Sequence, residues 1–250
     1  MSRPAYDRMG LNYGDFRRPD PRIEAALWEA LGDAESVVNV GAGTGSYEPG
    51  DREVVAVEPS PVMIAQRPPG RAPALRGVAE ALPLPDASVD AAMGVLTMHH
   101  WADVAAGLAE MRRVARRRIV LLTIDAEVVA EAWIVKDYFP RAGEIDRAVL
   151  PSMAVLRALL PGARVDVVPV PRRCRDEFTI ALWDRPEMLL EPEVRRASSI
   201  WHRMPVEETA RGLARLRAEL ESGRWDEKHG HLRNQAELDI GLRLVREELR

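Results

Sequence analysis

Short apolar runs alternate with segments of helical spacing along the first half of the chain. Apart from Asn39 these runs contain no polar residue, which is typical of strands buried on both faces of a sheet; they cover residues 37–40, 54–57, 91–96 and 119–122. The segment from Ile23 to Leu31 instead repeats its apolar residues every three or four positions, which predicts a helix. Alternating helices and strands predict a parallel sheet with helices on both faces, the doubly wound α/β class.

The pattern changes after the fourth of these runs. Helical spacing predicts helices over residues 127–139 and 151–160, and a further apolar run predicts a strand over residues 164–170. Residues 191–201 and 205–221 again have helical spacing. The later part of the chain is therefore expected to be mainly helical.

The turn after the first predicted strand has glycines at alternate positions, Gly41, Gly43 and Gly45. Because glycine has no Cβ, such a backbone can turn tightly and approach a ligand closely. The next predicted strand ends in Glu58, where an acid can accept hydrogen bonds from both hydroxyls of a ribose. These features predict a pocket for an adenosine-containing cofactor at the carboxyl edge of the sheet.

A dinucleotide is one alternative for this pocket. Dinucleotide-binding domains have the spacing G-x-G-x-x-G and hold the pyrophosphate at the following helix N-terminus. Here Ser46 stands where that pattern has its third glycine, and the next residues would repel a pyrophosphate through Glu48 and Asp51 and would end a helix at Pro49. An NAD-dependent oxidoreductase is therefore the least favoured of the alternatives.

The G-x-G-x-G turn, with a polar residue two positions before it, resembles motif I of the class I S-adenosylmethionine-dependent methyltransferases. Further segments resemble this family in the right order: the lead-in 13–23, residues 77–90 with their Pro-Asp turn, and the strand and loop 91–101 that end in His-His-Trp. The resemblance covers roughly residues 6–170 and is to the small-molecule, methyltransferase type 11-like members. The chain departs from the family at Asn39, where an acid is usual, and before the fifth strand, where Arg116, Arg117 and Arg118 replace a Pro-Gly-Gly turn.

The resemblance implies S-adenosyl-L-methionine as the cofactor and implies which residues hold it. Glu58 would bind the ribose, and a small residue and an acid after the third strand would lie near the adenine. The implied cofactor-binding residues are Tyr13, Arg17, Asn39, Gly41, Ala42, Gly43, Glu58, Pro59, Met63, Ala79, Glu80, Val95, Leu96 and His99.

The family's Rossmann-like sheet closes with a seventh, antiparallel strand, for which this chain offers residues 178–183 or 238–245. We favour the C-terminal candidate. Residues 1–171 would then be the cofactor-binding core with its N-terminal segment, residues 172–236 a helical insertion or lid, and residues 237–250 the last strand of a seven-stranded, mostly parallel sheet.

The loop after the fourth strand lies near the sulfonium in this family, and here it has His99 and His100. Methyl transfer is an in-line displacement that depends mainly on positioning and on exclusion of water, and a histidine base helps when the nucleophile is oxygen or nitrogen. We expect one of the two to polarise or deprotonate the acceptor; the alternative is that they hold loop backbone or the cofactor's methionine end. No metal site is expected, because Asp103 and Asp125 are isolated and no Cys/His set has zinc spacing.

The composition of the chain limits which binding partners and which cellular compartment are expected. The 35 Lys and Arg residues against 39 Asp and Glu residues, without a basic stripe, give no reason to expect nucleic acid binding. The single Cys174 fits a reducing compartment, and the chain has neither a signal-peptide pattern nor an apolar run near the roughly 18 residues of a membrane span. A cytoplasmic monomer or homodimer without membrane contact is expected.

The expected function is methyl transfer from S-adenosylmethionine to a small organic acceptor. Candidate walls of the acceptor pocket are the aromatic residues Tyr6, Tyr13, Phe16, Trp101, Trp133, Tyr138, Phe139, Trp183 and Trp201. The alternative from another functional class is a protein that binds S-adenosylmethionine without transferring its methyl group, which the missing acid at Asn39 mildly favours.

Overall fold

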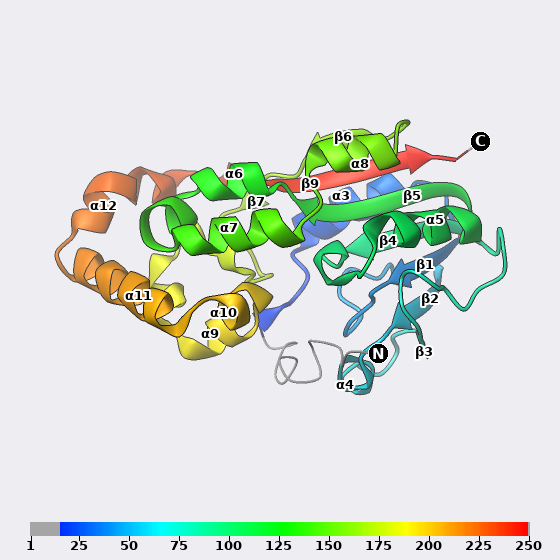
Figure 1. Cartoon of the computed structure of the whole chain (residues 1–250), viewed down its shortest axis with the longest axis horizontal. Helices are drawn as coiled ribbons and strands as arrows, with labels where there is room; N and C mark the ends of the chain where they lie inside the picture. Colours follow the sequence, from blue (N-terminus) through cyan, green and yellow to red (C-terminus); the bar gives the residue numbers. More distant parts are fainter. Residues whose placement is uncertain (1–15, 250) are drawn as a thin grey trace.

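The computed structural model describes residues 16–249 and is built around a seven-stranded sheet of order β3-β2-β1-β4-β5-β9-β6 (Figure 1). Its first five strands are parallel to one another: β1 (Ser36–Val40), β2 (Glu53–Glu58), β3 (Ala74–Arg76), β4 (Val89–Val95) and β5 (Ala115–Ile124). The strand order reverses between β1 and β4, and ligands of open α/β sheets bind at such a switch point, beyond the carboxyl ends of the strands. The predicted doubly wound class is confirmed.

The C-terminal segment forms the seventh strand. β9 (Leu242–Glu248) runs antiparallel between β5 and β6 (Arg164–Val167). The competing candidate at residues 178–183 is a buried 3-10 helix, η3 (Thr179–Leu182). A separate short pair is made by β7 (Val170–Pro171) and β8 (Glu237–Leu238).

Helices cover both faces of the sheet because successive strand residues point to opposite sides. Val37 packs in one buried cluster with α3 (Pro21–Leu31), and its neighbour Val38 packs in the other cluster with α5 (Val104–Val114) and α8 (Met153–Leu159). The short α4 (Pro61–Ala65) follows β2. Where the family has a Pro-Gly-Gly turn, α5 here ends at Val114 and β5 begins with the next residue.

The remaining helices form a lobe at one end of the sheet, on the left in Figure 1. They come from two parts of the chain: α6 (Ala126–Glu131), the π-helical turn η2 (Ile134–Tyr138) and α7 (Pro140–Val149), then η4 (Pro186–Leu190), α9 (Pro192–Arg196), α10 (Ser199–Arg203), α11 (Val206–Glu221), α12 (Arg224–His229) and η5 (Gly230–Asn234). No helix within residues 16–249 combines the length and the apolar character that a membrane crossing requires.

Two predicted helices are interrupted in this lobe. The helix expected over residues 127–139 breaks at Ala132, whose backbone is extended, and the indole of Trp133 then donates a 3.0 Å hydrogen bond to the carbonyl of Trp183. The helix expected over residues 191–201 is divided into α9 and α10. Helical spacing shows which residues are buried, but these long-range contacts decide where the helix stops.

Most of the aromatic residues expected to wall an acceptor pocket pack the lobe instead. Trp133 meets Trp225 edge-on with ring centroids 5.2 Å apart, and Phe139 meets Trp201 at 4.8 Å. The buried cluster that contains these rings continues to Val37 of β1. The lobe and the sheet therefore share one apolar core.

Candidate active site

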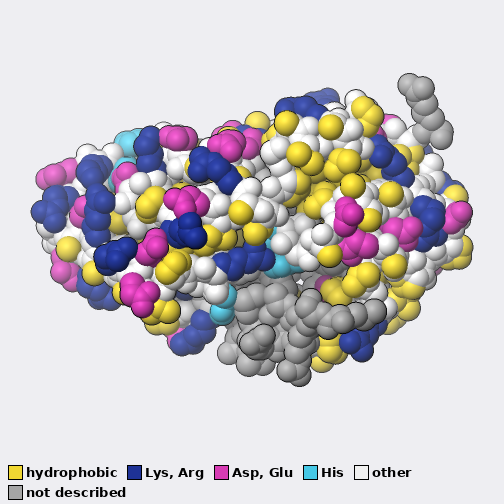
Figure 2. Space-filling model, in the orientation of Figure 1, with side chains coloured by type: hydrophobic (Ala, Val, Ile, Leu, Met, Phe, Trp, Pro, Cys, Tyr) yellow, Lys and Arg dark blue, Asp and Glu magenta, His cyan; other side chains and the backbone are white. Residues whose placement is uncertain are grey.

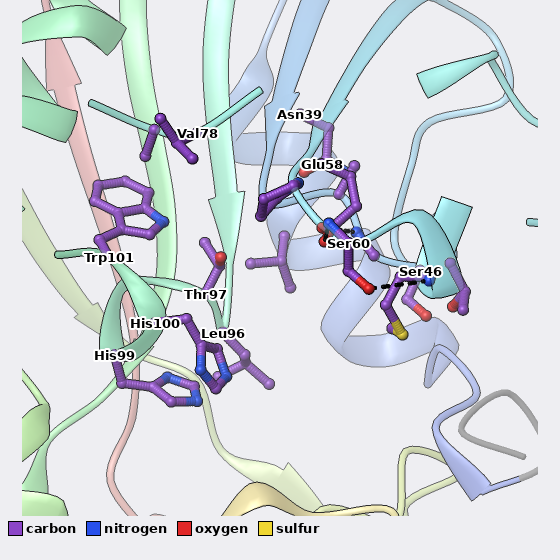
Figure 3. Close-up of a pocket in the computed structure, with 18 of the residues that line it drawn as sticks. Asn39, Ser46, Glu58, Ser60, Val78, Leu96, Thr97, His99, His100 and Trp101 are labelled. Atoms are coloured by element: carbon purple, nitrogen blue, oxygen red, sulfur yellow. Dashed lines mark hydrogen bonds between the residues drawn. The ribbon is translucent and has the colours of Figure 1, made fainter. Parts of the chain in front are cut away.

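A cavity with a volume of about 430 Å³ opens beyond the carboxyl ends of β1, β2 and β4 (Figure 3). Its lining includes every predicted cofactor residue within residues 16–249, together with His100: Arg17, Asn39, Gly41, Ala42, Gly43, Glu58, Pro59, Met63, Ala79, Glu80, Val95, Leu96 and His99. Tyr13 lies outside the described residues. The tertiary structure thus brings the predicted set together, and its role in cofactor binding stays a prediction.

The glycine turn needs glycine for two different reasons. Gly41 and Gly43 have φ angles of 70° and 52°, in the left-handed region that disfavours other residues. A Cβ on Gly41 would lie 2.0 Å from Oγ1 of Thr97, so the turn packs against the loop after β4. A Cβ on Gly43 would have only Cε of Met63, at 3.4 Å, as a near neighbour. Gly43 therefore leaves the cavity open for a ligand.

Glu58 joins two loops of the cavity. Its Oε2 accepts a 2.8 Å hydrogen bond from the amide of Gly43, and its Oε1 accepts a 2.9 Å bond from the amide of Ser60. The carboxylate is 6% exposed. An ionised carboxylate accepts up to about four hydrogen bonds, so the same group can bind ribose hydroxyls beside these amides. The position predicted for ribose binding is thus held by the backbone of the glycine turn.

A buried acid nine positions later, Glu48, explains why position 39 has an asparagine instead of the acid that is usual there. Nδ2 of Asn39 donates a 3.1 Å hydrogen bond to Oε1 of Glu48, whose other oxygen lies 2.7 Å from the guanidinium of Arg67. An acid at position 39 would face the Glu48 carboxylate directly. Oδ1 of Asn39 is buried and has no hydrogen-bond partner among the described residues, so it can accept a bond from an ammonium group in the cavity.

Glu48 was expected to repel a pyrophosphate, and this expectation is wrong. The structure places this carboxylate outside the cavity lining, where Arg67 neutralises it, so it does not repel a ligand in the pocket. The glycine spacing and the short, proline-containing segment after the turn still argue against a dinucleotide.

The two histidines face the cavity from a strained loop. Leu96, just after β4, has a φ of 48°, which is unfavourable for a residue with a Cβ. The chain then forms the short 3-10 helix η1 (Met98–His100), and the two imidazole rings lie 3.9 Å apart between centroids. In Figure 3, His99 and Leu96 lie on the side of the cavity opposite Glu58 and Ser60.

Both imidazoles are neutral at neutral pH. Burial, reinforced by the charge of Arg203, lowers the pKa of His100 to about 4. Burial also holds the pKa of His99 well below its ordinary value, with smaller contributions from His100, Arg203 and Arg17. A neutral imidazole can donate one hydrogen bond and accept another.

Tyr47, Asp176 and Arg203 line the cavity and were not predicted from the sequence. Asp176 accepts hydrogen bonds from Nε of Arg17 and, at 3.0 Å, from the hydroxyl of Tyr47. Arg203, at the end of α10, lines the cavity from the helical lobe. Asp176 is 159 positions from Arg17, so only the folded chain brings them together.

Among the predicted aromatic walls within residues 16–249, only Trp101 lines this cavity. Trp133, Tyr138, Phe139 and Trp183 are buried in the core, and Phe16 and Trp201 pack against it. Tyr6 lies outside the described residues.

Comparison with known proteins shows similarity to methyltransferases. A family described as a methyltransferase domain matches residues 38–122, from β1 to β5. An uncharacterised methyltransferase of Mycobacterium tuberculosis (strain H37Rv) is 40% identical over 123 residues, covering 43% of this chain and 49% of that protein. The chain spans about half the length of the curated relatives it matches.

Solved structures extend the likeness to nearly the whole chain. A putative methyltransferase from an antibiotic biosynthesis pathway of Anabaena variabilis has a TM-score of 0.85 and 34% identity, over 94% of this chain and 99% of that one. A methyltransferase of Thermotoga maritima, possibly a histamine N-methyltransferase, has a TM-score of 0.57 at 16% identity over 98% of both chains, which is a likeness of fold alone. The chain belongs to the class I S-adenosylmethionine-dependent methyltransferase family, whose cofactor is S-adenosylmethionine.

Proposed function

We propose that this protein transfers a methyl group from S-adenosylmethionine to a small organic molecule. The observation that carries the proposal is that Glu58 accepts hydrogen bonds from the amides of Gly43 and Ser60, which hold its carboxylate beside the glycine turn at the carboxyl edge of the sheet, where it would bind the ribose. Both hydrogen bonds are made within the protein itself, so they would hold the carboxylate in place for a ligand.

The remaining groups of the cavity fit the other end of the cofactor. The buried Oδ1 of Asn39 would accept a hydrogen bond from the ammonium group of the methionine moiety. Arg17, which donates to Asp176 and to the carbonyl of Ala197, would lie beside its carboxylate as the complementary charge. The sulfonium supplies an activated methyl carbon, to which a lone pair of the acceptor bonds while the C–S electron pair passes to sulfur.

We assign positioning rather than proton abstraction to His99 and His100. A general base works best when its pKa is near the operating pH, and the pKa of about 4 for His100 is far below neutrality. Neutral rings also avoid placing a second positive charge beside a sulfonium. They would orient the acceptor through hydrogen bonds, and proximity would supply most of the rate.

A small acceptor is favoured by the small volume of the space beside the histidines and by the distribution of charge on the surface. Beyond the histidines, the lobe leaves a second cavity with a volume of only about 80 Å³. Basic and acidic side chains are interspersed over the face drawn in Figure 2, and its described residues form no continuous basic stripe of the kind that nucleic acid requires.

Titration calorimetry with S-adenosylmethionine, S-adenosylhomocysteine and NADH, side by side, tests the proposal. We expect saturable binding of the first two and none of NADH. Binding of NADH alone would overturn the proposal and the role given to Glu58.

A protein that binds the cofactor without methyl transfer is the second candidate. The absence of an acid at position 39 suggested it, but Glu48 accounts for the asparagine there, so the substitution does not indicate a lost function. Release of S-adenosylhomocysteine in the presence of a panel of small acceptors, followed by mass spectrometry, distinguishes the two.

A further inference from the structure

The second cavity adjoins the first on the side of the helical lobe. Arg17, Leu96, His99 and Arg203 line both cavities, so they form the junction. The remaining walls come from the end of β5, from α7, from η3 and from α10, and they are mainly apolar: Ile124, Val149, Leu150, Phe178, Ile180 and Ile200. A ligand here would lie directly beside the part of the first cavity that the histidines face.

Two opposite charges in this cavity lack partners. Asp146 lies on α7 and Arg203 on α10, and both side chains are half-buried. Within residues 16–249 neither forms an ion pair or a side-chain hydrogen bond, with each other or with any other group. Burying an unpaired charge among apolar residues is costly, which makes this arrangement unusual for a region without a ligand.

Apart from the attraction between Asp146 and Arg203 themselves, the neighbouring groups do not compensate these charges. Arg17 is paired with Asp176, and His99 is neutral. Burial raises the pKa of Asp146 to about 6, and the charge of Arg203 opposes the rise, so the carboxylate is ionised at neutral pH. The hydroxyls of Thr179 and Ser198, which also line the cavity, are buried without partners among the described residues. All four groups require partners that the described chain does not supply.

Given the proposed function, on which this inference rests, we propose that the second cavity is the acceptor subsite and takes a small zwitterion. Its apolar body would lie against the aliphatic walls, with an ammonium group at Asp146 and a carboxylate at Arg203. Because Arg203 lines both cavities and Asp146 only the second, the carboxylate would lie nearer the cofactor and the ammonium group farther from it. Opposite charges placed apart in this way also discriminate against a simple amine or a simple acid.

Calorimetry on protein saturated with S-adenosylhomocysteine tests this with three matched probes: L-leucine, 3-methylbutylamine, which lacks the carboxylate, and 4-methylpentanoate, which lacks the amine. We expect leucine to bind at least tenfold tighter than either of the others. Asp146→Asn should weaken leucine and the amine at least tenfold and spare 4-methylpentanoate. Arg203→Gln should weaken leucine and 4-methylpentanoate and spare the amine.

The controls are Glu144→Gln and Arg211→Gln, which remove exposed charges from α7 and α11 and should leave all affinities within twofold. Failure of the unmodified protein to bind S-adenosylhomocysteine would contradict the proposed function. Normal S-adenosylhomocysteine binding with no binding of the probes, or probe affinities that neither variant changes, would overturn this inference alone. A tenfold loss of S-adenosylhomocysteine affinity in Arg203→Gln would assign Arg203 to the cofactor and would also overturn it.

Discussion

The two halves of the site are built in different ways. In the half predicted to bind the cofactor, Glu58 is held by the amides of Gly43 and Ser60, which lie near it in the sequence. In the acceptor half, Asp146 and Arg203 come from two helices of the lobe and remain without partners among the described residues. The first half fixes its carboxylate through hydrogen bonds within the protein, whereas the second has two charges that a ligand would complete.

This difference predicts where substitutions act. A preorganised site binds tightly because little has to be ordered on binding, so changes in the glycine turn should act on cofactor affinity. Changes in the acceptor half should leave the cofactor in place. Substitutions in each half, each with a matched control, test that separation.

Gly43→Val should have the largest effect on the cofactor. The side chain would enter the cavity beside Met63 from a backbone at a φ of 52°, and we expect a loss of S-adenosylmethionine affinity of roughly 100-fold by calorimetry. Gly50→Val is the matched control, since a Cβ there meets nothing within 4 Å. Circular dichroism should show both variants folded. An affinity of Gly43→Val within threefold of the unmodified protein would show that the ligand does not approach this turn.

Glu58→Ala should cause the second-largest loss of cofactor affinity. It removes the acceptor of two loop amides and of the ribose hydroxyls, and a hydrogen bond to a charged group contributes about 1.5–3 kcal/mol, a loss of roughly 10- to 150-fold in affinity. Asp51→Ala, at a carboxylate whose side chain is 70% exposed, is the control. A loss smaller than twofold would place the ribose elsewhere.

Asn39→Asp, which restores the acid usual in the family, should lower stability here. The new carboxylate would lie against Glu48 in a buried site, and we expect the free energy of unfolding in urea to fall by about 1–3 kcal/mol. The double variant Asn39→Asp with Glu48→Gln exchanges the acid and the amide, so it should recover at least half of the loss. No recovery would mean that this contact does not explain Asn39.

The smallest effect concerns the pH dependence of stability, to which one group of each half contributes. The pKa of His100 falls from 6.5 unfolded to about 4 folded, so its contribution to stability is complete above 6.5 and is lost as pH falls towards 4. Asp146 acts in the opposite direction, because its pKa rises from 3.8 to about 6 on folding: its contribution is complete below 3.8 and is lost as pH rises to 6.

Thermal unfolding followed by circular dichroism measures the balance between these two contributions to stability. We expect the melting temperature to fall by a few degrees from pH 7 to pH 5, less steeply in the double variant His99→Asn, His100→Asn, and more steeply in Asp146→Asn. His231→Asn, at an exposed histidine, should not change the slope. Unchanged slopes in the two site variants would show that these groups are not buried as described.

The sequence alone predicted the sheet and the residues of the proposed cofactor half. Continuous apolar runs predicted the parallel strands, and Gly41, Gly43 and Glu58 could be recognised because they lie on adjacent strand ends within 18 positions of one another. The place of the last strand was a choice between two segments, which the pairing of β9 with β5 and β6 decided. Local spacing was sufficient wherever the residues of a site follow each other along the chain.

Only the tertiary structure decided the acceptor half. Asp146 lies in α7, where the pattern of residues along the sequence indicates no chemical role for it. Arg203 ends α10, which was expected to be part of a longer helix. Periodicity identifies a buried residue but not its neighbour, so Trp133 and Trp183 were expected at a pocket and lie in the core. Contacts between segments tens of residues apart depend on how the lobe packs against the sheet, and no local pattern in a single chain records them.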